Sequence, residues 1–202
     1  MIALDIEASG IDSRKSSILS IGAVDFDNPD NQFYDECRVW DGAHISDEAL
    51  AVNGFSREEA VDPVKKSEAE LVKAFLAWAM ELRDWTIVGQ NPSFDRDYVL
   101  AACERAGIEF PFAHRTVDTH SLAYMHMVFH GITPPFDAEK HRTALNLDAA
   151  LQYVGIPEEP KPHNALTGAM SHAEVASRLL YGKSLLPDFD VYPLPWEVPR
   201  KG

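Results

Sequence analysis

The sequence predicts an α/β fold in which helices cover both faces of a mixed five-stranded sheet. Two observations support this prediction. Three strand-like segments follow one another through short turns at the start of the chain, which is typical of antiparallel strands. Helical and strand-like segments alternate through the rest of the chain, which is typical of sheets with helices on both faces. The first strand is therefore expected at the centre of the sheet.

The strands are recognised by alternation and by apolar runs between turn residues. In the first strand, large apolar residues alternate with small or acidic ones, so Asp5 and Glu7 project from the same side. The next two strands are separated by a dense turn signal at 28–31. The expected strands are residues 1–7, 17–26, 32–40, 86–90 and 116–119.

Amphipathic spacing and capping residues locate the helices. One helix is expected to begin with Asn91 at its N-cap and Pro92 at its first position, and to end at Gly107. The earliest helical segment is broken by Asn53-Gly54. Helices are expected at 45–60, 67–83, 91–107, 121–129, 146–154 and 164–181, with loops at 131–140 and 156–162.

The chain has 202 residues, enough for one domain with a sizeable core. We expect one domain over residues 1–182 and a Pro-rich tail over 183–202. The tail carries four prolines between Pro187 and Pro199, so it is expected to be extended, either docked on the body or loose.

Composition narrows the class of protein. No apolar run reaches the length of a membrane span. The two cysteines are too few for a disulfide framework, so a reducing, cytoplasmic location is expected. The net charge of −14 argues against a protein that coats nucleic acid through a broad basic surface. It is compatible with an enzyme that admits one strand end into a small metal-lined cleft.

The acidic pair of the first strand is the first candidate site. Asp5 and Glu7 repel each other and raise one another's pKa unless a cation lies between them. Oxygen ligands favour hard divalent ions such as Mg²⁺ or Mn²⁺. The alternative is a solvated strand end, where acidic residues are common.

Two further candidates lie at helix starts. Asp95 is expected in the first turn of its helix, where a carboxylate is favoured by the helix dipole whether or not it has a function. His163 precedes the last helix. A histidine near a metal site can deprotonate a water molecule, although a lone histidine there is more often a surface residue.

Together these segments resemble the three motifs of the DEDDh 3′–5′ exonucleases, which have a ribonuclease H-like fold. The matching residues are Asp5-Ile-Glu7, Asn91-x-x-Phe94-Asp95 and His163-x-Ala165, in the family's order. The resemblance implies hydrolysis of phosphodiester bonds from the 3′ end of single-stranded nucleic acid, with release of nucleoside monophosphates. Whether the substrate is DNA or RNA stays open, as does a homodimer.

The resemblance also implies roles for individual residues. Asp5, Glu7 and Asp95 would hold Mg²⁺ or Mn²⁺, and His163 would accept the proton of the attacking water. Residues next to these motifs would contact the terminal nucleotide or shape its pocket, namely Ala8, Ser9, Gly10, Asn91 and Phe94.

One position departs from the family. Its third motif is His-x-x-x-x-Asp, and the fifth residue after His163 is Gly168. The alternative function is therefore a catalytically weakened or inactive member that binds nucleic-acid ends or a partner. His172 shares the helix face of Gly168 and is weighed as a substitute ligand that would favour Mn²⁺, against a half-exposed helix residue. We interpret His126 and His130 as packing residues, and His120 as a hydrogen-bonded residue at a helix start.

Overall fold

The computed structural model describes residues 1–196, and it contains the predicted mixed sheet. Five strands form this sheet in the order β3-β2-β1-β4-β5. β1 (Ile2–Ala8) is central and pairs antiparallel with β2 (Ile18–Asp25) and parallel with β4 (Ile87–Gly89). β3 (Gln32–Glu36) extends the antiparallel side, and β5 (Val117–Asp118) extends the parallel side. The predicted position of the first strand is confirmed.

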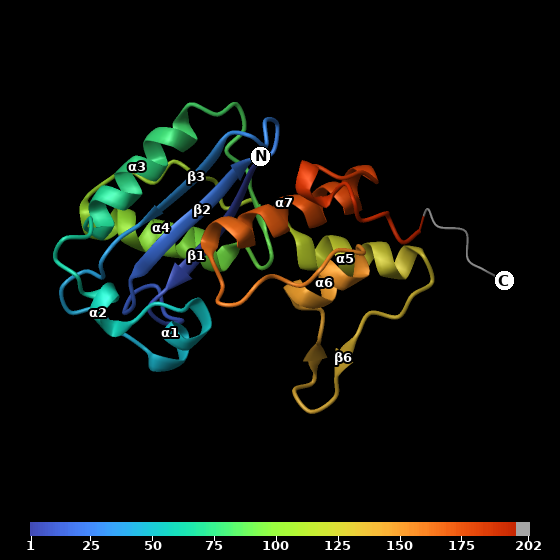
Figure 1. Ribbon diagram of the computed structural model, residues 1–202, viewed down its shortest axis with the longest axis horizontal. Helices are drawn as coiled ribbons and strands as arrows, with labels where there is room; N and C mark the ends of the chain where they lie inside the picture. Colours follow the sequence, from blue (N-terminus) through green and yellow to red (C-terminus); the bar gives the residue numbers. More distant parts are fainter. Residues whose placement is uncertain (197–202) are drawn as a thin grey trace.

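Helices cover both faces of the sheet, as predicted (Figure 1). α3 (Glu68–Met80) and α4 (Ser93–Ala106) lie on one face, and α7 (Ala165–Tyr181) crosses the other. The large apolar side chains of β1 pack with α3 and α4, whereas the opposite face of β1 packs with α7. Because strand side chains alternate, Asp5 and Glu7 lie on the face that α7 covers.

α7 approaches the sheet closely because small residues face it. A Cβ atom on Gly22 of β2 would overlap the backbone of Ala165, so only glycine fits where the start of α7 crosses the strand. Alanines continue this contact along the helix, at 169, 173 and 176. The short distance brings the first turns of α7 directly over the acidic end of β1.

The remaining helices surround this core. α1 (Asp47–Asn53) and α2 (Arg57–Ala60) are separated at Gly54, whose φ of 76° ends α1, so the predicted break is confirmed. α5 (Thr119–Phe129) and α6 (Leu147–Tyr153) pack with α7 around a second apolar cluster.

The predicted strand 32–40 is too long, because β3 ends at Glu36. The Cys37 N–H still donates to the Leu19 carbonyl oxygen, but the Arg38 N–H donates to the Lys66 carbonyl oxygen at 2.9 Å. This second bond draws the chain away from the sheet and toward the start of α3.

The predicted loop 131–140 contains a strand that sequence reasoning missed. β6 (Phe136–Asp137) pairs antiparallel with β7 (Arg142–Thr143), and this hairpin projects from the body (Figure 1). The strands are two residues long and therefore carry too little alternation to be recognised. Asp137 fixes the turn, since its Oδ1 accepts hydrogen bonds from the N–H groups of Glu139 and Lys140.

The predicted N-cap of α4 is also wrong. Pro92 occupies the N-cap position, and no side-chain hydrogen bond caps the helix there. Asn91 instead adopts a left-handed conformation with φ of 53°, and its side-chain oxygen accepts a hydrogen bond from the Ser93 hydroxyl at 2.9 Å. Asparagine tolerates this conformation better than most residues do.

The C-terminal segment docks on the body as far as residue 196. Leu186 and Leu194 are buried, and Trp196 packs beside His126 and Tyr153. It is not wholly extended, because Pro187–Phe189 forms a 3-10 turn. Pro199 lies outside the described residues. The division into 1–182 and 183–202 stays a prediction.

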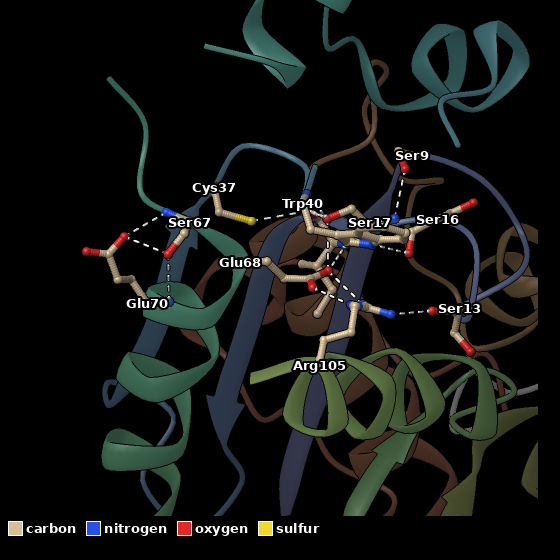
Figure 2. Close-up of polar contacts among 11 residues, drawn as sticks. Ser9, Ser13, Ser16, Ser17, Cys37, Trp40, Ser67, Glu68, Glu70 and Arg105 are labelled. Atoms are coloured by element: carbon tan, nitrogen blue, oxygen red, sulfur yellow. Dashed lines mark hydrogen bonds and ion pairs between the residues drawn. The ribbon is translucent and has the colours of Figure 1, made fainter. Parts of the chain in front are cut away.

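A buried ion pair joins the first turn of the sheet to α3 and α4 (Figure 2). Glu68 Oε1 accepts hydrogen bonds from the Ser17 hydroxyl and the Ile18 N–H, both at 2.9 Å. Arg105 of α4 contacts both carboxylate oxygens of Glu68 at 2.8 Å and also donates to the Ser13 carbonyl oxygen. These contacts fix the loop that follows β1, next to the acidic residues.

No helix within residues 1–196 is long and apolar enough to cross a membrane. Cys37 and Cys103 are both free and buried. Nothing in the fold bears on the predicted cytoplasmic location, which stays a prediction.

Candidate active site

The three predicted acidic residues lie at the same edge of the sheet. Asp5 and Glu7 lie in the second half of β1 and face α7. Asp95 is 3% exposed and lies in the first turn of α4, which follows β4. β1 and β4 are parallel neighbours, so their carboxyl ends, where ligands bind in such sheets, lie at the same edge.

The electrostatics of these carboxylates show that they influence one another. Burial raises the pKa of Asp5 to about 7; the Glu159 charge raises it further, and His163 lowers it. Burial and the charges of Asp5 and Glu159 raise the pKa of Glu7 to about 8. For Asp95, burial and then the charge of Asp5 raise the pKa well above the usual range of a carboxyl group. The group is therefore a cluster of like charges in a poorly solvated place.

Glu7 lacks an internal partner for its charge. Glu7 is only 8% exposed, and within residues 1–196 its carboxylate makes no hydrogen bond or ion pair. A buried carboxylate without such partners is unfavourable by several kcal/mol in order of magnitude. The site therefore favours a cation from solution.

His163 immediately precedes the N-cap of α7, and its charge acts on Asp5. Its backbone N–H donates to the Val52 carbonyl oxygen at 3.2 Å, and its side chain is 33% exposed. Together with Tyr34 and Asn53, it lines a pocket of about 220 Å³. The imidazole is thus held near the carboxylates and remains accessible to solvent.

Glu159 is a site residue that sequence reasoning missed. It lies in the loop between α6 and α7 and is 8% exposed. Its Oε1 lies 2.9 Å from the Thr167 hydroxyl, and its Oε2 lies 3.9 Å from His163 Nδ1. Nothing in the sequence distinguishes it, because it belongs to none of the three motifs and is one of 32 acidic residues.

Gly168 lies directly against Asp5. A Cβ atom at position 168 would overlap Asp5 Oδ2 and would lie 2.7 Å from Asp5 Cγ. A longer side chain there requires the Asp5 carboxylate to turn away, which a short terminal group can do at low cost. The absence of a side chain at Gly168 is therefore what lets Asp5 rest against α7.

The predicted nucleotide-contacting loop after β1 is held by internal hydrogen bonds. The Ala8 carbonyl oxygen accepts from Asn53 Nδ2 at 3.1 Å, and the Gly10 carbonyl oxygen accepts from the Tyr98 hydroxyl at 2.6 Å. The Ser9 hydroxyl accepts from the Ser17 N–H at 2.9 Å. The loop is rigidly placed beside Glu7, and its contact with a nucleotide stays a prediction.

Asn91 and Phe94 lie on the other side of Asp95. The Asn91 N–H donates to Asp118 Oδ1 at 3.0 Å. Asn91 and Asp118 also line a pocket of about 560 Å³ whose wall includes residues of the β6–β7 hairpin. Phe94 is partly buried and packs on Tyr98, with ring centroids 5.0 Å apart. Their predicted roles in shaping a substrate pocket stay predictions.

The prediction that His172 is a half-exposed helix residue is wrong, because His172 is only 2% exposed. Its Nδ1 lies 2.9 Å from the Leu4 carbonyl oxygen, and burial lowers the pKa of its imidazole. We interpret His172 as a neutral packing residue whose Nδ1–H donates to the backbone of β1. This arrangement gives no support to the predicted Mn²⁺ preference, which stays untested.

His120 and His126 are placed as predicted, whereas His130, predicted as a packing residue, is exposed. His126 packs between Tyr153 and Trp196, and its Nδ1 lies 2.7 Å from the Tyr153 hydroxyl. His130 stacks on His126 with ring centroids 4.2 Å apart. The His120 N–H donates to Asp118 Oδ1 at the start of α5, which confirms the predicted helix-start role.

The acidic cluster fits a divalent cation in its donor chemistry. Asp5, Glu7 and Asp95 supply carboxylate oxygens, which are the donors that Mg²⁺ and Mn²⁺ prefer. Within residues 1–196, however, no three His, Cys, Asp or Glu side chains are already gathered so that they could hold a metal ion. Binding would require these carboxylates to turn toward a shared position.

Sequence comparisons agree with the motifs. Residues 1–180 match the family described as the 3'-5' exoribonuclease Rv2179c-like domain. Ribonuclease T from Haemophilus influenzae is 28% identical over 141 residues, which cover 60% of the chain and 59% of that protein. Ribonuclease T from Yersinia pestis is 28% identical over 138 residues, covering 60% of the chain and 63% of that protein. The chain thus matches about three fifths of the length of these relatives.

Solved structures show the same fold. The nuclease domain of 3'hExo, a DEDDh family member bound to rAMP, superposes with a TM-score of 0.66 at 14% identity, covering 92% of this chain and 93% of that one. E. coli Exonuclease I in complex with a dT13 oligonucleotide superposes with a TM-score of 0.68 at 17% identity, covering 94% of this chain and 42% of that one. The chain therefore shares the fold of these two nuclease structures.

Proposed function

The chain belongs to the Rv2179c-like family of DEDDh 3′–5′ exonuclease domains, and on this premise we propose that it is a 3′–5′ exoribonuclease. It removes nucleoside monophosphates from the 3′ end of single-stranded RNA by hydrolysing phosphodiester bonds. RNA is favoured over DNA because the matching family is described as exoribonucleases and the similar curated proteins are named Ribonuclease T.

The observation that carries this proposal is the buried acidic cluster at the carboxyl ends of β1 and β4. Asp5 and Glu7 come from the first motif and Asp95 from the second. The charge of Asp5 raises the pKa of Glu7 and of Asp95, and the charge of Glu7 also raises the pKa of Asp95. A cluster of like charges is unfavourable in a folded chain, so its presence is explained best by binding of a divalent cation.

Family membership implies divalent metal ions, and the proposed ligands are Asp5, Glu7 and Asp95. Mg²⁺ or Mn²⁺ bound there would lower the pKa of the attacking water and offset the charge that develops on the leaving oxygen. The chain itself supplies the low-dielectric setting, because burial of the three carboxylates strengthens their attraction for a cation.

His163 is the proposed general base. It lies beside the acidic cluster with its side chain one-third exposed, so a water molecule can approach it from solvent. The neutral imidazole accepts the proton from that water at one ring nitrogen, and the nearby carboxylates stabilise the imidazolium that results. Its fixed backbone, bonded to Val52, limits how far the ring can move from the site.

The proposed nucleotide contacts flank the acidic residues. Ala8, Ser9 and Gly10 form the rigid loop beyond Glu7, and Asn91 and Phe94 lie around the start of α4. We assign these residues to the terminal nucleotide because they are the described groups adjacent to the carboxylates on either side. Residues 1–182 would form the exonuclease domain and 183–202 its Pro-rich tail.

Gly168 favours a second candidate, a weakened or inactive member that binds RNA ends without cutting them. In this proposal Gly168 stands where the family's third motif carries its last Asp. The variant Gly168→Asp distinguishes the two candidates. A sharp gain in cleavage identifies a weakened enzyme, whereas unchanged strong cleavage shows that this position does not limit the chain.

A nuclease time course tests the proposed function. Single-stranded RNA and DNA labelled at the 5′ end are incubated with Mg²⁺, Mn²⁺ or chelator, and Asp5→Asn controls for contaminating nucleases. We expect a ladder that shortens from the 3′ end, faster on RNA, and that is lost with chelator and in Asp5→Asn. Absence of cleavage in a folded sample with either metal would reject the enzyme and favour the binding module.

A further inference from the structure

We propose that Glu159 supplies the fourth carboxylate of the cation site, from a loop instead of from position 168 of α7. This inference rests on the proposed function. It assigns a metal-binding role to a residue outside the three motifs.

The first argument comes from the buried glutamates. Within residues 1–196 four glutamates are less than 9% exposed. Two of them, Glu68 and Glu174, form ion pairs with the arginines Arg105 and Arg178. Glu7 and Glu159 contact no lysine or arginine among the described residues. These two buried side chains therefore have no internal lysine or arginine partner, and the charge of Glu159 acts on Glu7.

The second argument is the immediate surroundings of Glu159. Its Oε1 has only the Thr167 hydroxyl within 2.9 Å, and that hydroxyl lies equally close to the Asn164 carbonyl oxygen. A hydroxyl has one proton, so it can satisfy only one of these acceptors at a time. Oε2 lies 3.9 Å from His163 Nδ1, which is longer than a hydrogen bond. The carboxylate is buried and poorly neutralised.

The third argument is position. Thr167 and Gly168 are adjacent on α7, and Gly168 lies against Asp5. Glu159 bonds to the first of these residues, so its carboxylate lies at the same turn of α7 that would carry the missing side chain. The charge of Glu159 acts on both Asp5 and Glu7, which places it within electrostatic reach of both. A carboxylate can therefore reach the cation site either from residue 159 in the loop or from position 168 of α7.

Neighbouring contacts fix this loop in place. The ring of Pro162 packs against Gly54, where a Cβ atom would be 2.6 Å from Pro162 Cβ. Ile156 is buried at the other end of the loop, and the His163 N–H is bonded to Val52. The backbone that presents Glu159 is thus anchored on both sides, as a ligand position requires.

Binding of Mn²⁺ without substrate tests the inference directly. The Mn²⁺ dissociation constant is measured by isothermal titration calorimetry and by the electron paramagnetic resonance of free Mn²⁺. Glu159→Gln removes the charge and keeps the shape, and we expect it to weaken Mn²⁺ binding by roughly tenfold or more. Glu158→Gln, at an exposed neighbouring position, is the matched control and should stay within about twofold of wild type.

A second variant covers misfolding of Glu159→Gln and shows which site is involved. In the Glu159→Gln background, Gly168→Asp returns a carboxylate to the same turn of α7. We expect this double variant to recover most of the lost Mn²⁺ affinity. Wild-type affinity in a folded Glu159→Gln sample would overturn the inference. So would a double variant that folds but binds Mn²⁺ no better than Glu159→Gln.

The same titration separates this inference from the proposed function. If wild type binds Mn²⁺ and cleaves RNA, and Glu159→Gln matches it in both, only the assignment of Glu159 is wrong. If wild type neither binds Mn²⁺ nor cleaves, and Asp5→Asn behaves identically, the proposed function is wrong as well. Weak binding in Glu159→Gln, with loss of binding in Asp5→Asn, supports both.

Discussion

Two buried glutamates, Glu68 at the start of α3 and Glu7 in β1, are neutralised differently. Glu68 accepts hydrogen bonds from Ser17 and Ile18 and pairs with Arg105 at 2.8 Å, so its charge is offset inside the protein (Figure 2). Glu7 is also buried, but it has no such hydrogen-bond or ion-pair partner within residues 1–196. The Glu68 carboxylate stabilises the contact between structural elements, whereas the Glu7 carboxylate remains available to a ligand.

This contrast teaches how to separate structural from functional acids. Burial alone does not distinguish them, because Glu68 is 4% exposed and Glu7 8% exposed. The presence of an internal cation does, since a paired buried charge stabilises only its own neighbourhood whereas an unpaired cluster attracts a cation. Variants of the two groups should therefore differ in their effects on cleavage and on stability.

Removing one charge from the unpaired cluster should nearly abolish cleavage. We expect Glu7→Gln to lower the rate of RNA shortening in Mn²⁺ by at least about a hundredfold, because a carboxylate ligand is lost. Initial rates on 5′-labelled RNA provide the measurement, with the exposed Glu58→Gln as the matched control. Comparable rates in Glu7→Gln and Glu58→Gln would contradict the assignment.

Breaking the paired group should instead unfold the protein more easily. Arg105→Met leaves the Glu68 carboxylate buried without its cation, and we expect a loss of about 3 kcal/mol in the free energy of unfolding. Urea denaturation gives this value. The double variant Glu68→Gln/Arg105→Met should recover part of the loss, because no unpaired charge remains. Equal losses in the single and double variants would show that packing, not charge, sets the cost.

The two groups should also respond with opposite signs to loss of a glutamate charge. In chelator, Glu7→Gln should raise the free energy of unfolding by about 1–2 kcal/mol, since repulsion within the cluster falls. Glu68→Gln should lower it, because the Arg105 ion pair is lost. Denaturation of both variants in the same buffer is the measurement. Destabilisation by Glu7→Gln would show that this carboxylate has a stabilising partner.

The smallest effect concerns the pH dependence of stability at His172. Burial lowers the pKa of this imidazole, so the unfolded chain binds the proton more readily than the folded one. Stability contributed by the neutral imidazole is complete above about pH 6.5 and is lost as the pH falls toward the folded pKa, with a slope of at most about 1.4 kcal/mol per pH unit. The difference in unfolding free energy between wild type and His172→Asn should therefore shrink from pH 7.5 to 5. A constant difference would contradict a buried neutral imidazole.

Local patterns were sufficient to predict most of the fold. Alternation in β1 placed Asp5 and Glu7 on one face, and the meander followed by alternating elements placed that strand at the centre. The edges of elements were harder, as the early end of β3 at Glu36 shows. That end depends on a hydrogen bond between Arg38 and Lys66, which no short-range pattern encodes.

The motif residues of the site could be recognised in the sequence. Which buried acids have an internal charge partner could not. Asp95 and His163 were found because they begin helices at recognisable positions. Whether a buried acid is paired depends on residues far along the chain, such as Arg105 for Glu68. Glu159 was missed for the same reason, since its place beside Asp5 arises from the packing of the loop before α7.

The most direct test of the account is the thermal midpoint of the wild-type protein with and without Mn²⁺. At a Mn²⁺ concentration about 100 times the dissociation constant, binding to the folded state should add about 2.7 kcal/mol, or roughly 5–10 °C for a chain of this size. Asp5→Asn should show little of this shift. Midpoints that do not move with Mn²⁺ in wild type, or that move equally in Asp5→Asn, would contradict the claim that the unpaired carboxylates form a cation site.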